Sequence, residues 1–135
     1  MIIEEALYAY LTNYAELTAL VGDRIYPVIL PQNTTLPAVT FQRISGIREY
    51  SQSGPSGLAH PRFQFSCWAE KYEEAKAVAE QIRLALEGYK GMMGGSDGVR
   101  VDAIYVEDDH DIYDPETKEY HVALDAIIWH EEVTA

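Results

Sequence analysis

The sequence has one cysteine, no long apolar run and no basic N-terminal segment. Cys67 alone excludes an intramolecular disulfide, and no Cys/His spacing typical of zinc sites occurs, which fits a reducing cytoplasm. The longest apolar runs, such as residues 126–129, are far shorter than the ~20 residues that cross a bilayer. Acidic residues also stand where a secretory signal would be basic. We therefore expect a soluble chain that is neither exported nor bound to a membrane.

Basic residues are also scarce. The chain has 10 Lys and Arg against 22 Asp and Glu, which gives a formal net charge of −12. A nucleic-acid clamp must neutralise phosphates with basic side chains, so this balance predicts repulsion from DNA.

The 135 residues, 47% of them hydrophobic, suffice for one domain with a single core, and we expect residues 1–135 to form it.

Apolar spacing predicts two helices and four strands. Residues 3–20, and a stretch that begins at residue 71 and ends before Gly88 or Gly91, repeat apolar side chains every three or four positions. Strand-like runs cover residues 38–46, 62–69, 99–107 and 120–130. The order helix, strand, strand, helix, strand, strand predicts an α+β fold, with a mostly antiparallel four-stranded sheet of two hairpins backed by two helices.

Residues 47–61 lie between two predicted strands and are rich in Ser, Gly and Pro. We expect them to form a long loop without secondary structure, and no charged residue lies between Tyr50 and Arg62. A loop of this length in a compact domain is usually functional or disordered. It is therefore the first candidate for a contact with another molecule.

Four aromatic residues, Tyr50, Trp68, Tyr113 and Trp129, are predicted to face away from the core. Tyr and Trp on an outer sheet face are typical of contacts between subunits. For Trp68 and Trp129, the alternative is a face covered by the chain's own helices or loops, because the pattern does not decide which face the helices cover.

The run EDDHD, residues 107–111, is the best local candidate for a metal site because hard cations favour carboxylate oxygens. It lacks the glycine and the ligand spacing of a calcium loop, and it lies at a predicted hairpin turn, where Asp is common for backbone reasons. We expect a solvated turn. The alternative is a small metal-dependent enzyme that uses Glu107, Asp108, Asp109 and Asp111.

Cys67 and His121 could form a nucleophile and its base, since both lie on predicted strands of one sheet. Cys67, however, alternates with Phe63 and Phe65 on the core side, and His121 lies on the opposite face of its strand. We expect a buried, inert cysteine. No catalytic, metal or cofactor site is therefore predicted.

Two blocks carry a family resemblance when they are considered together: LVGDRIYPVILPQNTTLPAVTFQRISG, residues 20–46, and RFQFSCWAEKYEEAKAVAEQIRLAL, residues 62–86. After a short N-terminal helix, they resemble the small tail-completion, or head-tail joining, proteins of long-tailed bacteriophages and prophages. The motifs GDRIYP, LPAVTF and CWAEKYEEA occur in that order. The likeness extends loosely into the last predicted hairpin.

The resemblance implies a non-enzymatic virion subunit, assembled in the bacterial host cytoplasm. It would form a sixfold homo-oligomeric ring at the head-tail interface, between the tail tube and the head connector proteins. DNA would pass through this ring without specific binding, past an acidic wall, and no cofactor or membrane is implied. Tail terminators and other connector adaptors share this size and ring habit and remain alternatives, as does a cellular protein-binding module unrelated to phages.

Carried onto this chain, the resemblance makes the two hairpins the ring wall and residues 47–61 the projecting element. Antiparallel hairpins leave an edge strand with unpaired backbone groups, to which a neighbour could add a strand. The assembly residues predicted on this basis are Trp68 and Trp129 on the sheet, and Arg48, Tyr50, Gln52, Pro55, Leu58 and His60 in the loop.

Overall fold

A computed structural model describes residues 1–134. The helices in this part of the chain are α1 (Ile3–Thr12), α2 (Ala15–Val21) and α3 (Tyr72–Leu86). The strands are β1 (Ile25–Pro27), β2 (Ala38–Ser45), β3 (Arg48–Ser51), β4 (Gly54–Ala59), β5 (Arg62–Ala69), β6 (Gly91–Met93), β7 (Val99–Asp114) and β8 (Glu119–Glu131).

The strands form one mixed sheet with β8 at its centre. Along one path the order is β1-β2-β5-β8-β4-β3, and β7 pairs with β8 and with β6. Only the pairing of β1 with β2 is parallel among those described for residues 1–134. Strand β8 pairs with β5 near its start and with β4 at its end, so β4 continues the line of β5.

The predicted fold class was wrong, because within residues 1–134 the sheet has eight strands and three helices accompany it. The predicted helix over residues 3–20 is broken at Asn13, whose side-chain amide donates to the Ala9 carbonyl at 2.7 Å and ends α1. Strands β1, β3, β4 and β6 have at most six residues and alternate poorly between buried and exposed positions. They therefore carry little of the pattern on which sequence-based prediction depends.

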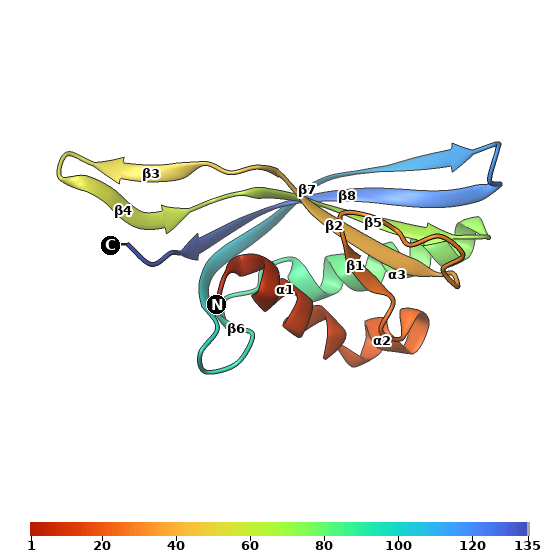
Figure 1. Ribbon diagram of the computed structural model, residues 1–135, viewed down its shortest axis with the longest axis horizontal. Helices are drawn as coiled ribbons and strands as arrows, with labels where there is room; N and C mark the ends of the chain where they lie inside the picture. Colours follow the sequence, from red (N-terminus) through yellow and green to blue (C-terminus); the bar gives the residue numbers. More distant parts are fainter. Residues whose placement is uncertain (135) are drawn as a thin grey trace.

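The core lies between the helices and one face of the sheet (Figure 1). Strand β5 alternates strictly, with Phe63, Phe65 and Cys67 buried toward the helices. The Tyr10 hydroxyl of α1 donates to the Ala85 carbonyl of α3 at 2.6 Å, and burial raises the pKa of Tyr10 to about 12. This bond ties two helices together over the sheet.

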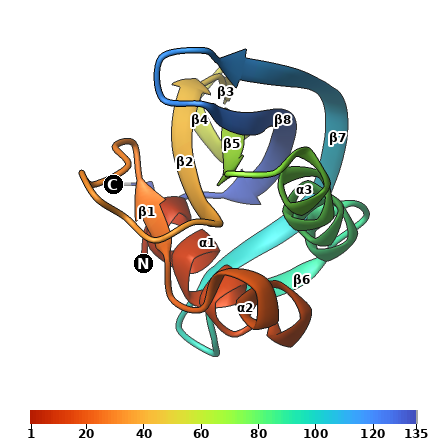
Figure 2. The same cartoon turned by 90° about the vertical axis from the view of Figure 1, so that its right-hand side faces the viewer.

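Two hairpins project from opposite ends of the long axis (Figure 1). One consists of β3 and β4, and the other is the far end of β7 and β8. Viewed along that axis, β2, β8 and β7 curve around the side on which α1 and α3 lie (Figure 2). Within residues 1–134, no helix combines the length and the apolar character needed to cross a membrane.

Gly94, after β6, lies against α1 and provides a stability test. Its φ is +89°, and a Cβ added there would lie 3.0 Å from Ala6 Cα. Gly94→Val should therefore lower the free energy of unfolding by about 3 kcal/mol, through backbone strain and displacement of α1. Urea unfolding measures this change.

Gly95→Val is the matched control, because Gly95 also has a positive φ, +97°, but no atom lies within 4 Å of its added Cβ. This variant should show the strain alone. Equal losses at the two positions would contradict close packing of Gly94 on α1.

Candidate assembly surfaces

Residues 47–61 are not the irregular loop that the sequence predicts, since they contain the β3–β4 hairpin. Tyr50 pairs with Pro55 and Ser51 with Gly54, which leaves Gln52 and Ser53 in the turn. Gly54 has a φ of +129°, a value that side-chain-bearing residues avoid. The strand pattern is hidden because most of these residues are small or polar and stay exposed, and only Leu58 and Ala59 at the end of β4 turn toward the interior.

The base of this hairpin is clamped to the end of the chain. Ala59 pairs with His130 of β8, and the Glu132 amide donates to the Gly57 carbonyl at 2.7 Å. Arg48 forms a two-bond ion pair with the Glu132 carboxylate, at 2.7 and 3.1 Å. That pair raises the pKa of Arg48 and lowers the pKa of Glu132. The hairpin is therefore anchored at one end while its tip projects.

The six residues predicted for this segment divide between base and tip. Arg48 and His60 lie at the base, where the His60 ring faces the Glu49 carboxylate at 2.9 Å. Leu58 is half-buried beside β8. Tyr50, Gln52 and Pro55 are exposed, and 71% of Tyr50 is accessible. These last three lie nearest the tip, whereas the side chains of Arg48 and His60 are engaged by Glu132 and Glu49 at the base.

The two tryptophans lie on the sheet face opposite the core residues. Each is half-buried and stacks on a histidine, Trp68 on His121 at 4.1 Å and Trp129 on His60 at 4.0 Å between ring centroids. The Trp68 indole also donates to the Thr40 hydroxyl at 3.0 Å. No helix packs on this face, because the buried residues of the described helices join the core on the other side.

The sequence predicts that the acidic cluster lies at a hairpin turn, and this prediction was wrong. The cluster lies within strand β7. The Glu107 carboxylate accepts from Arg62 of β5 at 2.6 Å. Asp111 accepts from Tyr72 and Lys76 of α3, and these bonds lower the pKa of Asp111. Within residues 1–134, no three acidic, His or Cys side chains are grouped as metal ligands. Glu107 and Asp111 thus face different partners, and the cluster does not converge on one point.

The pairing of Cys67 with His121 fails on geometry. Cys67 is fully buried in the core, where burial raises the pKa of its thiol to about 12. His121 stacks on Trp68 on the opposite face, and burial lowers its pKa. Neither the thiolate nor a shared cavity is available for nucleophilic chemistry.

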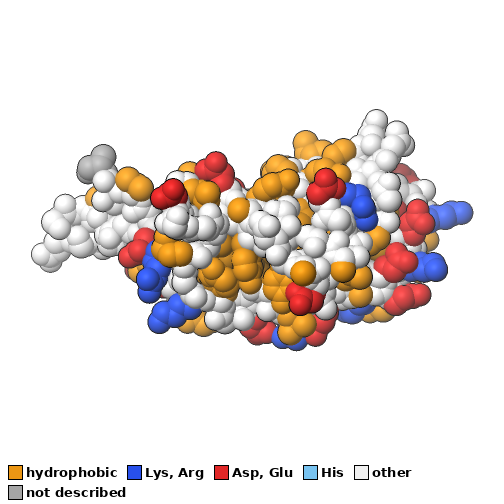
Figure 3. All heavy atoms as spheres, turned by 90° about the horizontal axis from the view of Figure 1, so that it is seen from below, with side chains coloured by type: hydrophobic (Ala, Val, Ile, Leu, Met, Phe, Trp, Pro, Cys, Tyr) orange, Lys and Arg blue, Asp and Glu red, His pale blue; other side chains and the backbone are white. Residues whose placement is uncertain are grey.

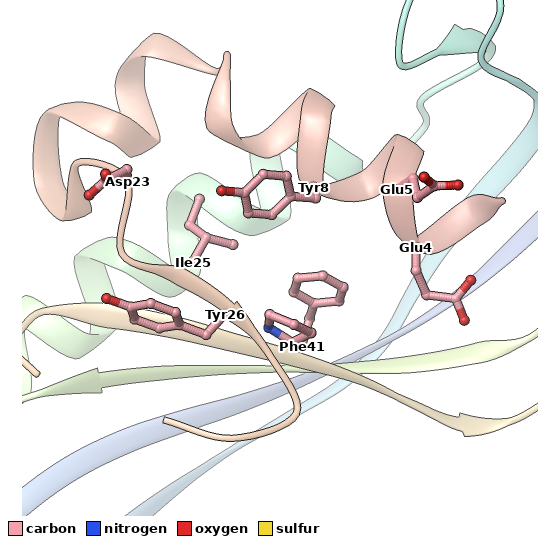
Figure 4. Close-up of a pocket in the computed structure, with 8 residues that line it drawn as sticks. Glu4, Glu5, Tyr8, Asp23, Ile25, Tyr26 and Phe41 are labelled. Carbon is pink, nitrogen blue, oxygen red and sulfur yellow. The ribbon is translucent and has the colours of Figure 1, made fainter. Parts of the chain in front are cut away.

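An open groove of about 660 Å³ lies between α1 and β1. Tyr8, Ile25, Tyr26 and Phe41 line it, with Glu4 and Glu5 at one end and Asp23 at the other (Figure 4). An apolar floor between carboxylates has the chemistry to hold a partner side chain with an apolar stem and a basic end. It has no convergent set of catalytic groups.

A second groove, of about 910 Å³, was not apparent from the sequence. We call it the His130 groove; it lies where the N-terminal end of α1, the β6–β7 connection and the end of β8 meet. His130 is 2% exposed, yet its Nε2 has no hydrogen-bond partner within residues 1–134. Sequence reasoning missed it because its walls come from segments far apart in the chain.

The surface of the projecting hairpin differs from the rest of the molecule. Seen from the helical side, the far end of the hairpin shows no acidic or basic side chain, whereas charged side chains are scattered over the body (Figure 3). This agrees with the sequence, in which no charged residue lies between Glu49 and Arg62. The tip can therefore approach an acidic molecule without charge repulsion.

The comparisons with known proteins agree on one kind of relative. The family described as "Tail completion protein gp17" matches residues 5–131. A solved chain from the "Virion of native gene transfer agent (GTA) particle" has the same fold, with a TM-score of 0.79 at 20% sequence identity. That match covers 96% of this chain and 94% of the other. No curated protein matches the sequence.

Proposed function

Because this chain belongs to the tail completion protein gp17 family, we propose that it is a non-enzymatic phage structural protein that completes the tail and joins it to the head connector. It acts by assembling into a homo-oligomeric ring, sixfold as the family resemblance implies, within the virion. Its partners are its own copies, the tail tube and the head connector proteins.

The projecting β3–β4 hairpin is the observation that carries this proposal. Its base is fixed by the Arg48–Glu132 pair and by the ladder to β8, so the tip is presented in a defined direction. A preorganised element loses little conformational entropy on binding, which favours its use as a contact. Exposed Tyr50, Gln52 and Pro55 supply the contacting side chains.

Two further features support assembly through the sheet. Among the described residues, no strand pairs with the outer edge of β3, or with that of β7 beyond Val101. Such edges accept a strand from a neighbour, and a repeated head-to-tail contact closes a ring when its rotation permits. Half-buried Trp68 and Trp129 on the uncovered face can pack on an adjacent subunit.

The acidic balance suits a protein that DNA passes. A net charge of −12 repels phosphates, so a wall with these side chains does not retain DNA. Glu107, Asp108 and Asp109 on exposed β7 are the carboxylates we assign to the lumen. Their neutralisation should slow DNA ejection, and unchanged ejection kinetics would contradict the assignment.

Deletion of the gene from the phage or prophage that encodes the chain tests the function. We expect DNA-filled heads and separate, unattached tails by electron microscopy, restored to virions when the wild-type chain is supplied in trans. Normal virions in the deletion strain would exclude a joining role. Tails of uncontrolled length would instead indicate a tail terminator.

A further inference from the structure

The His130 groove contains a polar atom without an internal partner. The Nδ1 atom of His130 faces the Glu131 carbonyl oxygen at 3.1 Å and donates to it, which leaves Nε2 as an acceptor. Burial lowers the pKa of the ring and keeps it neutral. A buried acceptor of this kind is normally satisfied. Because the Nε2 atom is itself buried beneath the groove, a donor from another molecule reaches it only when the side chains around the ring shift.

The walls of the groove are nearly balanced in charge, unlike the chain as a whole. They carry Arg43, Arg48 and Arg100 against four acidic residues. Two of these carboxylates are already paired, Glu4 with Arg43 at 3.2 Å and Glu132 with Arg48 at 2.7 Å. In a chain of net charge −12, this surface repels another copy less than the acidic remainder does.

We propose that the His130 groove binds the tip of the β3–β4 hairpin from a second copy of this chain. The proposal rests on the ring assembly proposed above and names the surface that receives the hairpin. The tip supplies hydroxyl and amide donors, from Ser51, Gln52 and Ser53, for the acceptor in the groove. It brings no charge, so no carboxylate of one copy meets a carboxylate of the next.

Apolar side chains are present on both sides of the proposed contact. Met1, Ile2 and Met92 in the groove are 46–61% exposed. Tyr50 and Pro55 are exposed on the hairpin. Burial of these side chains against one another would remove apolar surface from water on both copies.

The hairpin of one copy cannot fill its own groove. Arg48 lines the groove and also begins β3, whose four residues then run outward over about 13 Å. The tip points away from the body (Figure 1). The contact therefore joins the hairpin of one copy to the groove of the next, a head-to-tail arrangement that generates rings.

Disulfide cross-linking in assembled particles tests the contact. The full chain carries Ser53→Cys in the tip and Met92→Cys in the groove, both exposed positions; buried Cys67 stays unreactive. After mild oxidation, we expect a ladder of covalent multimers on a non-reducing gel. The control variant carries Thr117→Cys with Met92→Cys. Its first cysteine lies in the β7–β8 turn, at the opposite end of the sheet from the hairpin tip, so this variant should give monomers. If the variant with Ser53→Cys and Met92→Cys assembles into joined virions but stays monomeric on the gel, the groove contact is overturned. The joining function itself would still stand.

If the two cysteine substitutions themselves prevent joining, a charge variant tests whether the hairpin tip binds the His130 groove. Ser53→Asp brings a carboxylate toward Asp97 and Glu131 of the groove and should reduce the yield of joined particles about tenfold. Thr117→Asp adds the same charge in the other turn and should leave the yield unchanged. Joining by Ser53→Asp at the wild-type yield would exclude the groove as the receptor.

His130→Phe separates a role in assembly from a role in folding. The change removes the buried unpaired Nε2 acceptor together with the 3.1 Å Nδ1 bond to the adjacent Glu131 carbonyl and keeps a ring of similar shape, so the Tm of the unassembled protein should change little. The yield of joined particles should fall. A clear drop in Tm would show that His130 serves the fold and would overturn the assignment of its nitrogen to a partner.

Discussion

Replacing Phe65 with Ala should lower the free energy of unfolding by about 3–5 kcal/mol, which is the usual cost of a phenylalanine deletion in a packed core. Phe65 is fully buried in β5. It pairs across the sheet with Phe41 on one side and Leu124 on the other, and its ring stacks 6.4 Å from that of Phe41. The cavity would therefore open at the centre of the sheet. A domain of this size has about 5–15 kcal/mol of stability in total.

Urea denaturation followed by circular dichroism measures the loss, with Ser66→Ala as the matched control. Ser66 is the next residue of β5 but points to the opposite face, where it is half-buried. Its replacement should change the free energy of unfolding by no more than about 0.5 kcal/mol. Similar losses for Phe65→Ala and Ser66→Ala would contradict the alternation that places the core on one face.

The parts of the fold that are predictable from sequence are those with a periodic apolar signal. The predicted strands over residues 38–46 and 62–69 contain β2 and β5, and α3 lies within the second predicted helix. The alternation in β8 also separates buried Val122 and Leu124 from Trp129 on the other face. In each of these elements one face meets the core, so the periodicity records the burial directly.

The remaining elements are specified by long-range contacts that no local pattern carries. Strand β1 has three residues and is extended because it pairs with β2. Strand β4 consists mostly of small residues, and its pairing with Glu131 and His130 of β8 spans about half of the chain length. Backbone hydrogen bonds to a distant strand leave no trace in side-chain periodicity.

The sequence indicates residues 47–61 as the candidate contact segment, but it does not predict that they form a hairpin. The lack of charge in residues 50–61 points to a contact segment, yet it does not show that the base is clamped or that the tip is ordered as a hairpin. Arg48 belongs to the clamp, through its pair with Glu132, which lies 84 positions away in the sequence. The groove around His130 depends on three such distant segments meeting.

Shortening the β3–β4 hairpin should abolish joining while the protein stays folded. Replacing residues 50–55 with Asn-Gly removes the tip and closes the strands with a favoured two-residue turn after Glu49. The Arg48–Glu132 pair, the bond between the Glu132 amide and Gly57, and the ladder to β8 all remain. The larger deletion of residues 52–59 would remove that ladder and confound folding with assembly.

Electron microscopy of particles should then show filled heads and unattached tails, and the melting temperature of the purified variant should match that of the wild type. The matched control replaces residues 115–118 with Asn-Gly, which trims the β7–β8 turn while Asp114 and Glu119 stay paired. It should join heads to tails normally. Because every copy in a ring loses the same contact, small losses of binding energy multiply around the ring and the effect should be nearly complete. Normal joining by the β3–β4 variant would exclude the hairpin as the assembly element and leave the open edges and the tryptophan face as the surfaces to test.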